Sequence, residues 1–334
     1  MLTLFSIPKP FRGHFKVVQT NAVRSWALLD PRPEIILLGD DEGTAEIAEE
    51  VGARHVAEVE RNEHGTPLVN SVFAKAEAAA SNSLMCYVNA DIVLMSDFPE
   101  TVQQVCRTLP DEPFLIVGRK IGGVDIPEFL DFGEPDWEQK LRERATAQGR
   151  YGTSDSDYFV FRKGLYPRIP PFAIGRFYWS PWFVYNAMSR SIKVIDATAM
   201  IMAVEPRHDY SHIRCVAGSP EEAFHDYSRI APTDAAKMAG NIEVNTNRKL
   251  FKGCKYWTTA NTSHVLTPTG LKPSSWKRKA LGFYIALSFK AGRAFHANPS
   301  LRRYLPIVRI VYRPLRPIVL GLQRLALSRG LRVR

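Results

Sequence analysis

Residues 84–95, LMCYVNADIVLM, form an apolar run that is interrupted once, by the polar triplet Asn89-Ala90-Asp91. The run up to Asp91 has the length and composition of a strand that is buried on both faces. The triplet therefore falls at the carboxyl end of a predicted strand, which is where open α/β sheets bind ligands. Amide and carboxylate oxygens at such a place suit a hard divalent cation and the phosphates that it carries. A turn that only ends the strand is the alternative.

The first 120 residues alternate between strand and helix patterns. Strands are predicted at residues 2–7, 34–38, 54–59, 84–91 and 114–117, and helices at residues 14–29, 44–51, 67–80 and 98–109. Pro67 fits the first position of the third helix, and Thr66 fits its N-cap. This alternation predicts an α/β fold with a mostly parallel central sheet and helices on both faces.

The second half of the chain is less regular. The patterns predict a helix at residues 137–147, a strand at 158–161, a short helix at 182–189 and two strands within 192–204. Ser180 and Pro181 fit the N-cap and the start of the short helix. We expect one domain at residues 1–271, followed by a basic helical tail at residues 272–334.

Charge is unevenly distributed along the chain. Residues 272–334 hold 15 of the 44 Lys and Arg residues and no Asp or Glu, so the rest of the chain is mildly acidic. The basic side chains of the tail are mixed with aliphatic and aromatic ones, as in segments that lie in the plane of an anionic bilayer surface. We expect the tail to bind such a membrane surface; a solvated basic helix packed on the domain is the alternative. Nucleic acid is not expected as a partner, because the aliphatic content is high and no nucleic-acid motif is recognised.

The cysteines and the N-terminus indicate a compartment. The four cysteines are scattered, without zinc-type spacing, at Cys86, Cys106, Cys215 and Cys254. This pattern is typical of reduced thiols in a cytosolic protein. Pro8 and Pro10 come too early for the apolar part of a signal peptide. No uncharged apolar stretch is long enough for a membrane span. We therefore predict a cytoplasmic protein that is peripherally associated with the inner membrane.

Two segments after predicted strands suit a donor ligand. Residues 39–43, GDDEG, follow the second strand, and a carboxylate such as Asp40 can accept hydrogen bonds from ribose hydroxyls or a base N–H. A helix start that favours acids through its dipole is the alternative. Residues 62–68, NEHGTPL, could lay the backbone amides near Thr66 against a phosphate or sugar. An ordinary capped loop is the alternative there.

Two further segments suit an acceptor. Residues 153–159, TSDSDYF, place carboxylates just before an apolar strand, where Asp157 could bind acceptor hydroxyls or act as a general base. Acids that merely form a turn are the alternative. Residues 174–182, IGRFYWSPW, are rich in aromatic rings. Rings such as Trp179 stack on sugar C–H faces, and Arg176 could fix hydroxyls. Core packing of the rings is the alternative.

The segment 208–212, HDYSH, carries two histidines four residues apart. Such a pair can share a metal ion on a helix, but the Glu of the zinc-protease motif is missing. A more economical hypothesis is that one histidine supplies a single ligand to a cation bound by the donor. A structural histidine is the alternative.

In their order and number, these motifs resemble a family of bacterial and plant glycosyltransferase-like proteins with the GT-A fold, over about residues 2–213. The resemblance rests on residues 5–11 (FSIPKPF), 38–43 (LGDDEG), 65–68 (GTPL), 87–92 (YVNADI), 156–161 (SDYFVF), 171–176 (PFAIGR) and 208–212 (HDYSH). It implies a single Rossmann-like GT-A domain, a nucleotide-diphospho-sugar donor and a divalent metal, Mn or Mg.

The resemblance also implies roles for individual residues. It places Pro8, Lys9 and Asp40 near the nucleoside, and Asn89 and Asp91 at the metal and the diphosphate. It makes His208 a further metal or diphosphate contact and puts Asp157, the candidate catalytic residue, on the acceptor side.

The chain departs from the family pattern at one place. Relatives carry Trp-Asp-Asn-Trp where this chain has Trp179-Ser180-Pro181-Trp182. The Asp is the usual base of an inverting enzyme, and Ser180 cannot replace it near neutral pH without an activator of its own. Either Asp157 serves as the base, or the mechanism is retaining, or activity is weak or lost.

We predict a metal-dependent glycosyltransferase that moves a sugar from a nucleotide-diphosphate donor to a glycan or lipid-linked acceptor. The alternative is a non-catalytic, membrane-associated binding protein on a decayed glycosyltransferase scaffold, which Ser180 favours. A nucleotidyltransferase ranks last, because residues 8–13, PKPFRG, lack the Gly-rich loop that such enzymes carry after the first strand.

Overall fold

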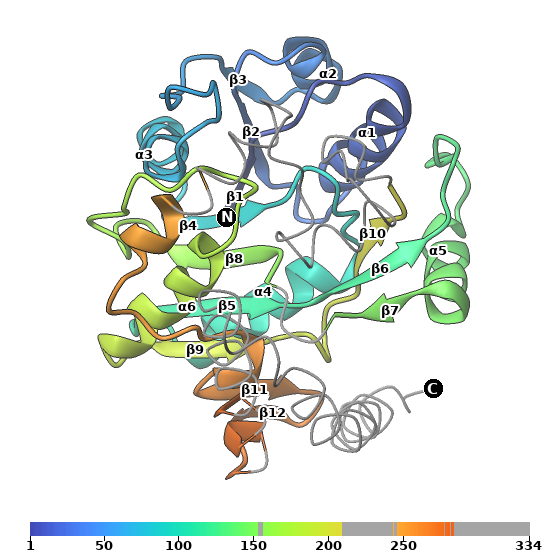
Figure 1. Cartoon of the computed structure of the whole chain (residues 1–334). Helices are drawn as coiled ribbons and strands as arrows, with labels where there is room; N and C mark the ends of the chain where they lie inside the picture. The colour runs from blue at the N-terminus through green and yellow to red at the C-terminus, as the bar shows by residue number, and fades with distance from the viewer. Residues whose placement is uncertain (153–155, 209–242, 244–245, 277, 281, 284–334) are drawn as a thin grey trace, which may run out of the picture.

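The structure is a computed structural model that describes residues 1–152, 156–208, 243, 246–276, 278–280 and 282–283. Its centre is a nine-stranded sheet (Figure 1). From one edge to the other, the strands are β12 (Gly270–Pro273), β11 (His264–Thr267), β9 (Lys193–Asp196), β5 (Phe114–Gly118), β8 (Tyr158–Arg162), β4 (Leu84–Val88), β1 (Leu2–Ser6), β2 (Glu34–Leu38) and β3 (Arg54–Val56).

The central sheet is mostly parallel. β8 runs antiparallel to both of its neighbours, β4 and β5, and β12 runs antiparallel to β11. Every other neighbouring pair is parallel. The predicted α/β fold with a mostly parallel central sheet is therefore confirmed.

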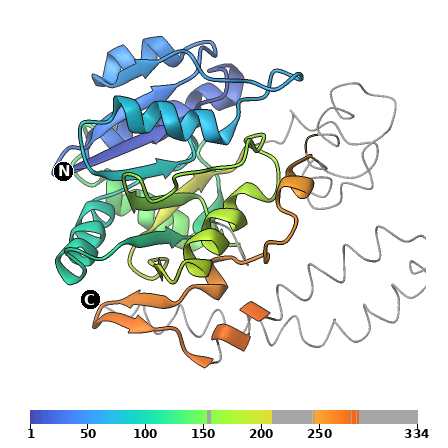
Figure 2. The same cartoon turned by 90° about the vertical axis from the view of Figure 1, so that its left-hand side faces the viewer.

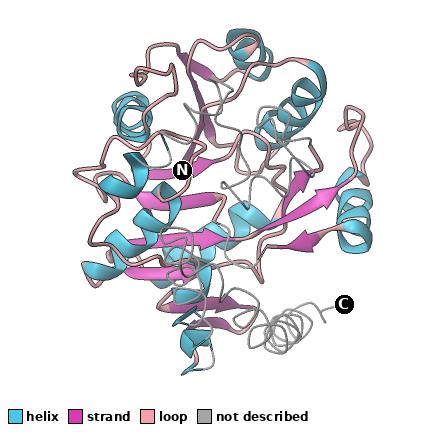
Figure 3. Cartoon of the chain, in the orientation of Figure 1, coloured by secondary structure: helices cyan, strands magenta, loops and turns pink. Residues whose placement is uncertain are grey.

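Two apolar layers cover the two faces of the sheet. One layer packs α1 (Gly13–Ala27), α2 (Thr44–Val51) and α4 (Asp97–Thr108) on the sheet, and the other packs α3 (Val69–Ala79) and α6 (Trp179–Ser189). Successive strand residues alternate between the layers: Cys86 and Val88 of β4 face the first, whereas Met85 and Tyr87 face the second. This alternation is the two-residue period of a strand that is buried on both sides. Figure 3 shows the helices flanking the strands.

A smaller sheet extends from the central one. It is ordered β10 (Ala203–Pro206), β6 (Lys120–Val124) and β7 (Arg150–Tyr151), and α5 (Trp137–Gln148) packs on it. Val93 N donates to Val204 O at 2.8 Å, and Val204 N donates to Val93 O at 3.0 Å. This backbone pair joins the segment after β4 to β10, so it brings the ends of two distant parts of the chain together.

Several helix and strand boundaries differ from the sequence prediction, and those of β4, α3 and α6 bear on the candidate site. β4 ends at Val88, so residues 89–91 form a turn beyond the strand. α3 begins at Val69, and Thr66 is not its N-cap. Thr66 instead closes a tight turn, because its carbonyl accepts from Asn62 N at 2.9 Å and its N–H donates to the Asn62 side chain. The prediction failed because this turn uses the same residue types as a helix start.

The start of α6 also differs. The helix begins at Trp179 rather than at residue 182, so Ser180 and Pro181 lie in its first turn. Tyr178 precedes it with φ of 86°, in the left-handed region, and its carbonyl accepts from Trp182 N at 3.1 Å. A left-handed Tyr is uncommon, so sequence patterns do not anticipate a helix that starts after one.

The predicted boundary between residues 271 and 272 lies inside β12, which pairs with β11 at the sheet edge (Figure 2). Ser274, directly after β12, donates to Thr262 O, and most of the predicted tail lies outside the described residues. The division of the chain into two parts stays a prediction. Among the described residues, no helix is long and apolar enough to cross a membrane.

Gly118 allows β5 to pair with β8. It lies opposite Tyr158, and a Cβ on Gly118 would be 1.8 Å from the Tyr158 Oη and 2.3 Å from its Cζ. Tyr158 is fully buried, so its ring has nowhere to move without disturbing the core. We expect Gly118→Ala to lower the free energy of unfolding by about 1–3 kcal/mol through overpacking. Chemical denaturation measures the change, with Gly133→Ala, in a loop, as control. An unchanged midpoint would contradict this pairing.

Candidate functional site

Three acidic or imidazole side chains meet at the carboxyl ends of β4 and β10: Asp91 follows β4, Glu205 lies in β10 and His208 follows it. The His208 Nε2 lies 3.6 Å from the Asp91 Oδ2 and 3.5 Å from the Glu205 Oε1. One ligand atom from each of the three residues lies within 4.8 Å of the others. Asp91 and His208 were predicted to be metal ligands, and the structure brings them together. Glu205, the third member, was missed.

Backbone contacts hold this cluster in place. Trp26 and Ser25 of α1 bind the segment after Asp91: the Trp26 Nε1 donates to Ile92 O at 2.8 Å, and the Ser25 Oγ accepts from Leu94 N at 3.1 Å. The Val93–Val204 pair then fixes Glu205 one residue beyond. The residues of the cluster therefore belong to main-chain segments that are fixed by hydrogen bonds. Such fixed segments hold the side chains of a binding site in defined positions.

The chemistry of the cluster fits a divalent cation. Carboxylates and imidazole are common ligands of Mn²⁺, and carboxylate oxygens suit Mg²⁺. The Asp91 Oδ1 is buried and has no hydrogen-bond partner among the described residues. A buried carboxylate oxygen is costly to leave without a partner, so a bound cation would satisfy it.

The electrostatics keep Glu205 ionised. Burial alone would raise the pKa of Glu205, but the positive charge of Lys120 and a hydrogen bond from His208 lower it to about 2. Burial would lower the pKa of His208, yet the bond to Glu205 and the negative charges of Asp91 and Glu205 raise it above its ordinary value. The ionised carboxylate of Glu205 therefore draws positive charge toward the cluster.

Lys9 adds a cation from the loop after β1. The residue is exposed, yet protein atoms crowd around its ammonium group, and this desolvation lowers its pKa; Asp91 and Glu205 oppose the shift. Its main chain is fixed by Gln19, which accepts from Lys9 N at 2.7 Å and donates to Lys9 O at 2.8 Å. Pro8, beside it, is buried. Lys9 is thus close enough to Asp91 and Glu205 to interact with their charges, whereas its predicted place near the nucleoside stays a prediction.

Asp157 approaches the cluster from β8. It is 6% exposed, and its Oδ1 accepts from the Asn89 Nδ2 at 3.2 Å and lies 3.3 Å from the Lys120 Nζ. The same ammonium also pairs with Glu205. Lys120 therefore links the candidate catalytic acid to the candidate metal ligands. Asn89 is held in turn by the Tyr87 hydroxyl, which donates to its Oδ1 at 3.1 Å.

The two other donor-side candidates are tied together by Arg61. The Arg61 guanidinium bonds to Asp40 at 2.7 Å and to Asp41 at 3.1 Å, and also donates to Gly65 O at 3.0 Å. The end of β2 is thereby joined to the turn that holds Thr66. The Asp40 side chain is 71% exposed, so it is open to a ligand.

A buried carboxylate connects this turn to the predicted acceptor side. The Glu243 side chain is 1% exposed and accepts from the Asn62 Nδ2 and the Arg176 Nε, each at 2.7 Å. Burial would raise the pKa of Glu243, but hydrogen bonds from Asn62, Thr66 and Arg176 lower it. Arg176 is thus oriented by Glu243, which sequence reasoning missed.

Trp179 lies mainly in the core. It is 7% exposed, and its ring is 5.3 Å from that of Tyr87 and 5.7 Å from that of Phe159. Trp179 therefore packs in the core, which is the alternative that the sequence analysis left open. A contact of Trp179 with an acceptor stays a prediction.

Some candidates lie outside the described residues. Residues 153–155 and His212 are not described.

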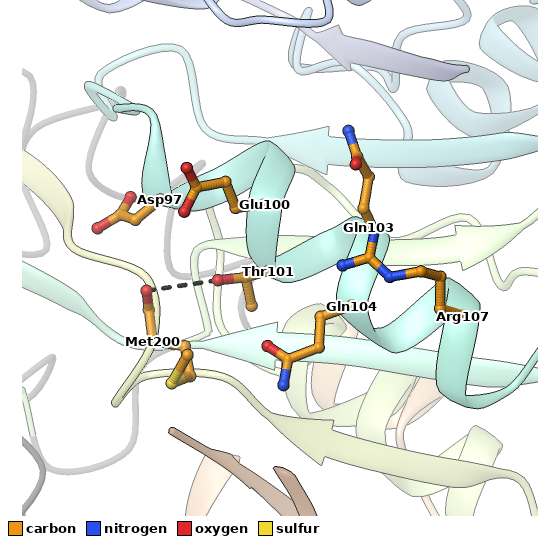
Figure 4. Close-up of a pocket in the computed structure, with 7 residues that line it drawn as sticks. All are labelled: Asp97, Glu100, Thr101, Gln103, Gln104, Arg107 and Met200. Atoms are coloured by element: carbon orange, nitrogen blue, oxygen red, sulfur yellow. Dashed lines mark hydrogen bonds between the residues drawn. The ribbon is translucent and has the colours of Figure 1, made fainter. Parts of the chain in front are cut away.

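One pocket lies away from the cluster. It has a volume of about 340 Å³ and lies along α4, lined by side chains that include Glu100, Gln104 and Arg107 (Figure 4). The Thr101 Oγ1 donates to Met200 O there at 3.4 Å. None of the cluster residues lines it, so it is not part of the candidate site.

The missed residues left weak signals. Glu205 stands three residues before His208 and directly after the strand pattern predicted within 192–204, and Lys120 follows the strand predicted at 114–117. Such positions next to strand ends are the signal that picked out Asp91. Glu243 had no such signal, because it lies in a polar, irregular part of the sequence.

Comparisons with known proteins give matches among solved structures. No protein-family model and no curated protein matches the chain. Glucosyl-3-phosphoglycerate synthase from Mycobacterium tuberculosis, in complex with Mn²⁺, uridine diphosphate and glucosyl-3-phosphoglycerate, is 14% identical to the chain, with a TM-score of 0.38, over 70% of this chain and 81% of the synthase. TarS 1–349 from S. aureus is 15% identical, with a TM-score of 0.31, over 49% of this chain.

The match spans 47% of that TarS chain, about half its length. TarS has also been solved in complex with UDP-GlcNAc. The similar structures are glycosyltransferases with the GT-A fold, the class to which the sequence motifs pointed. With TM-scores below 0.5, the functional argument rests on the side chains of this chain.

Proposed function

We propose that this protein is a metal-dependent glycosyltransferase that moves a sugar from a nucleotide-diphosphate donor to a glycan or lipid-linked acceptor. The observation that carries the proposal is the cluster of Asp91, Glu205 and His208 beyond the carboxyl end of β4. Ligands of open α/β sheets bind at this edge. The cluster combines a cation site with nearby lysines, which is the combination that a diphosphate needs.

Asp91, Glu205 and His208 would hold the cation. Mn²⁺ or Mg²⁺ bound there would neutralise the charge that develops on the departing diphosphate. Glu205 is an ionised ligand at neutral pH, since its pKa is about 2. Asn89, in the turn after β4, would contact the diphosphate.

The basic residues near the cluster would bind the diphosphate itself. The Lys9 ammonium interacts electrostatically with Asp91 and Glu205, so it stands where phosphate oxygens would arrive beside the cation. Pro8 would shape the nucleoside side of the same loop. Asp40 and Thr66, joined through Arg61, would complete the donor site by accepting and donating hydrogen bonds to the nucleoside and the sugar.

Asp157 is our candidate for the general base. It lies beside Asn89, directly before β8, and it is nearly buried. A carboxylate there would accept the proton of an acceptor hydroxyl as the bond to the sugar forms. Lys120 would hold that carboxylate in place through the ion pair at 3.3 Å. Arg176 and Trp179 would border the acceptor.

We place the reaction at the cytoplasmic face of the inner membrane, with the basic tail on the lipid surface. This part of the proposal rests on the charge of residues 272–334. A lipid-linked acceptor would then be presented close to the site.

The second candidate is a membrane-associated protein that binds the donor without transferring it. The observation that favours it is Ser180, which stands in the first turn of α6 where relatives with this motif carry the Asp. Slow release of free sugar from a nucleotide sugar, dependent on metal, would favour the enzyme over this candidate.

We expect Asp91→Asn to weaken binding of uridine diphosphate in the presence of Mn²⁺ by about tenfold or more, because the cation loses a charged ligand. Isothermal titration with Mn²⁺, and again with a chelator, measures the metal-dependent part. Asp111→Asn, at an exposed loop residue, is the matched control and should bind like the unmodified protein. Equal metal-dependent affinity in Asp91→Asn would remove the metal assignment.

We expect Asp157→Asn to slow metal-dependent hydrolysis of nucleotide sugars by about 100-fold, the usual contribution of a general base. Affinity for uridine diphosphate with Mn²⁺ should stay within a few-fold, because the residue lies on the acceptor side. Release of free sugar from a panel of donors is the readout, and Ser156→Ala is the control. A rate that survives Asp157→Asn would point to another base or to a retaining mechanism.

We expect Glu243→Gln to lower the free energy of unfolding at neutral pH by about 1–3 kcal/mol, because Arg176 and Asn62 lose a charged, buried acceptor. The folded pKa of Glu243 is lowered, so its contribution is present above the ordinary carboxyl range and is lost as the pH falls through the folded pKa. The stability difference between the two proteins should therefore shrink in acid. Denaturation at several pH values tests this, and a constant difference would contradict it.

A further inference from the structure

The start of the basic tail is docked on the domain. Ser274 is 6% exposed, and it donates to Thr262 O through its Oγ at 2.6 Å and to Ser263 O through its N–H at 2.8 Å. Helical residues follow at 276, 278–280 and 282–283. The Ser275 carbonyl accepts from Lys279 N at 3.0 Å, which starts the first turn.

The inner side of this turn is held by Arg278 and Gly282. The Arg278 guanidinium pairs with Asp196, which is 2% exposed, and donates to Thr259 O at 2.6 Å. Burial would raise the pKa of Asp196, but the charge of Arg278 helps to lower it. A Cβ on Gly282 would lie 2.4 Å from the Asn261 Nδ2, so the helix touches η2 (Thr259–Asn261) at close range.

Because Arg278 and Gly282 pack one side of this helical segment on the domain, its opposite side faces solvent. Trp276 and Phe283, seven residues apart and hence on the same side of a helix, are 74% and 69% exposed. Lys279 lies between them in sequence on that side and is exposed too. Lys272, just before, is also exposed. We call Trp276, Lys279 and Phe283 the outer face.

We propose that the outer face is the part of the tail that enters an anionic lipid bilayer at its surface. Large exposed aromatic residues on a docked helix expose apolar area to water, and this area is removed when the rings lie at the headgroup level. Lys279 and Lys272 bring positive charge to the same place, which complements anionic headgroups. The occupant is lipid rather than RNA, because the rings and aliphatic residues of the tail outweigh its polar groups.

The composition of the following chain supports a lipid surface over a protein partner. Residues 272–334 carry no acidic side chain, so the whole segment is repelled by basic surfaces and attracted by anionic ones of any shape. Binding to a membrane surface requires no shape complementarity. It requires basic and apolar side chains that can reach the headgroup region together. The docked turn would fix how the domain faces that surface.

This proposal rests on one part of the proposed function, the binding of residues 272–334 to a membrane, and it names the side chains that make the contact. It does not depend on the transfer of sugar. A protein that binds bilayers without transferring sugar would leave it intact. Point variants test it better than removal of residues 272–334, since that deletion also removes Arg278 and leaves Asp196 buried without its cation.

The experiment compares the full chain with Trp276→Ala/Phe283→Ala, with Lys279→Glu and with Phe129→Ala. Phe129 is 46% exposed and lies on the loop before α5, outside residues 272–334, so it is the matched control. Each protein is sedimented with vesicles of phosphatidylcholine, either alone or mixed with phosphatidylglycerol. Thermal melts check that the variants stay folded, as expected for exposed side chains.

We expect the unmodified protein and Phe129→Ala to sediment with the mixed vesicles and not with phosphatidylcholine alone. The double variant should bind the mixed vesicles at least about tenfold more weakly, and Lys279→Glu several-fold more weakly. Unchanged binding of the double variant would overturn the proposal. So would vesicle binding that is lost once the sample is treated with nuclease, which would indicate RNA as the ligand.

The same preparations separate this proposal from the proposed function. Metal-dependent binding of uridine diphosphate is measured on each variant without vesicles. Loss of vesicle binding with intact nucleotide binding supports the outer face, whereas absent nucleotide binding in every protein counts against the transferase and leaves the membrane result standing.

Discussion

Two backbone hydrogen bonds between Val93 and Val204 are the constraint on which the candidate site depends. They join the segment after β4 to β10, although the two lie far apart in the sequence. Asp91 comes just before one end of this pair, and Glu205 and His208 come just after the other. The three side chains are near each other because the main chain is paired there, and the side chains themselves, of like charge in two cases, would not gather unaided.

Acidic and basic side chains face each other around this point. Asp91, Glu205 and Asp157 bring three carboxylates to a small volume, and Lys9, Lys120 and His208 face them. Lys120 sits between Asp157 and Glu205, so it holds the two acids at a fixed separation. Burial of such a group of charges is expensive unless each is paired, and this arrangement is typical of sites that bind charged ligands rather than of sites that only stabilise a fold.

Sequence patterns predicted the fold well where a strand repeats a simple rule. Residues 84–88 are apolar on both faces, and the structure buries them between two helical layers. The patterns also singled out Asp91, at the end of a predicted strand, and His208, from its spacing to His212, and the structure places the two side chains together. Their role as metal ligands stays a prediction. They could not find Glu243, because its role is set by contacts with Asn62 and Arg176, which lie far away in sequence. They misplaced Thr66, because a turn and a helix start use the same residues.

The pairing of Gly118 with Tyr158 has a consequence for catalysis as well as for packing. The register of a buried strand depends mainly on which of its side chains face each side of the sheet. Because side chains alternate with a period of two residues, a slip of two residues would leave the same side chains on each side. Such a slip of β8 would move Asp157 by about 7 Å along the sheet. In one of the two directions it would also set the Tyr158 ring against the buried side chain of Ile116. The missing side chain of one glycine thus acts as a stop that sets the position of an acid at the ligand edge.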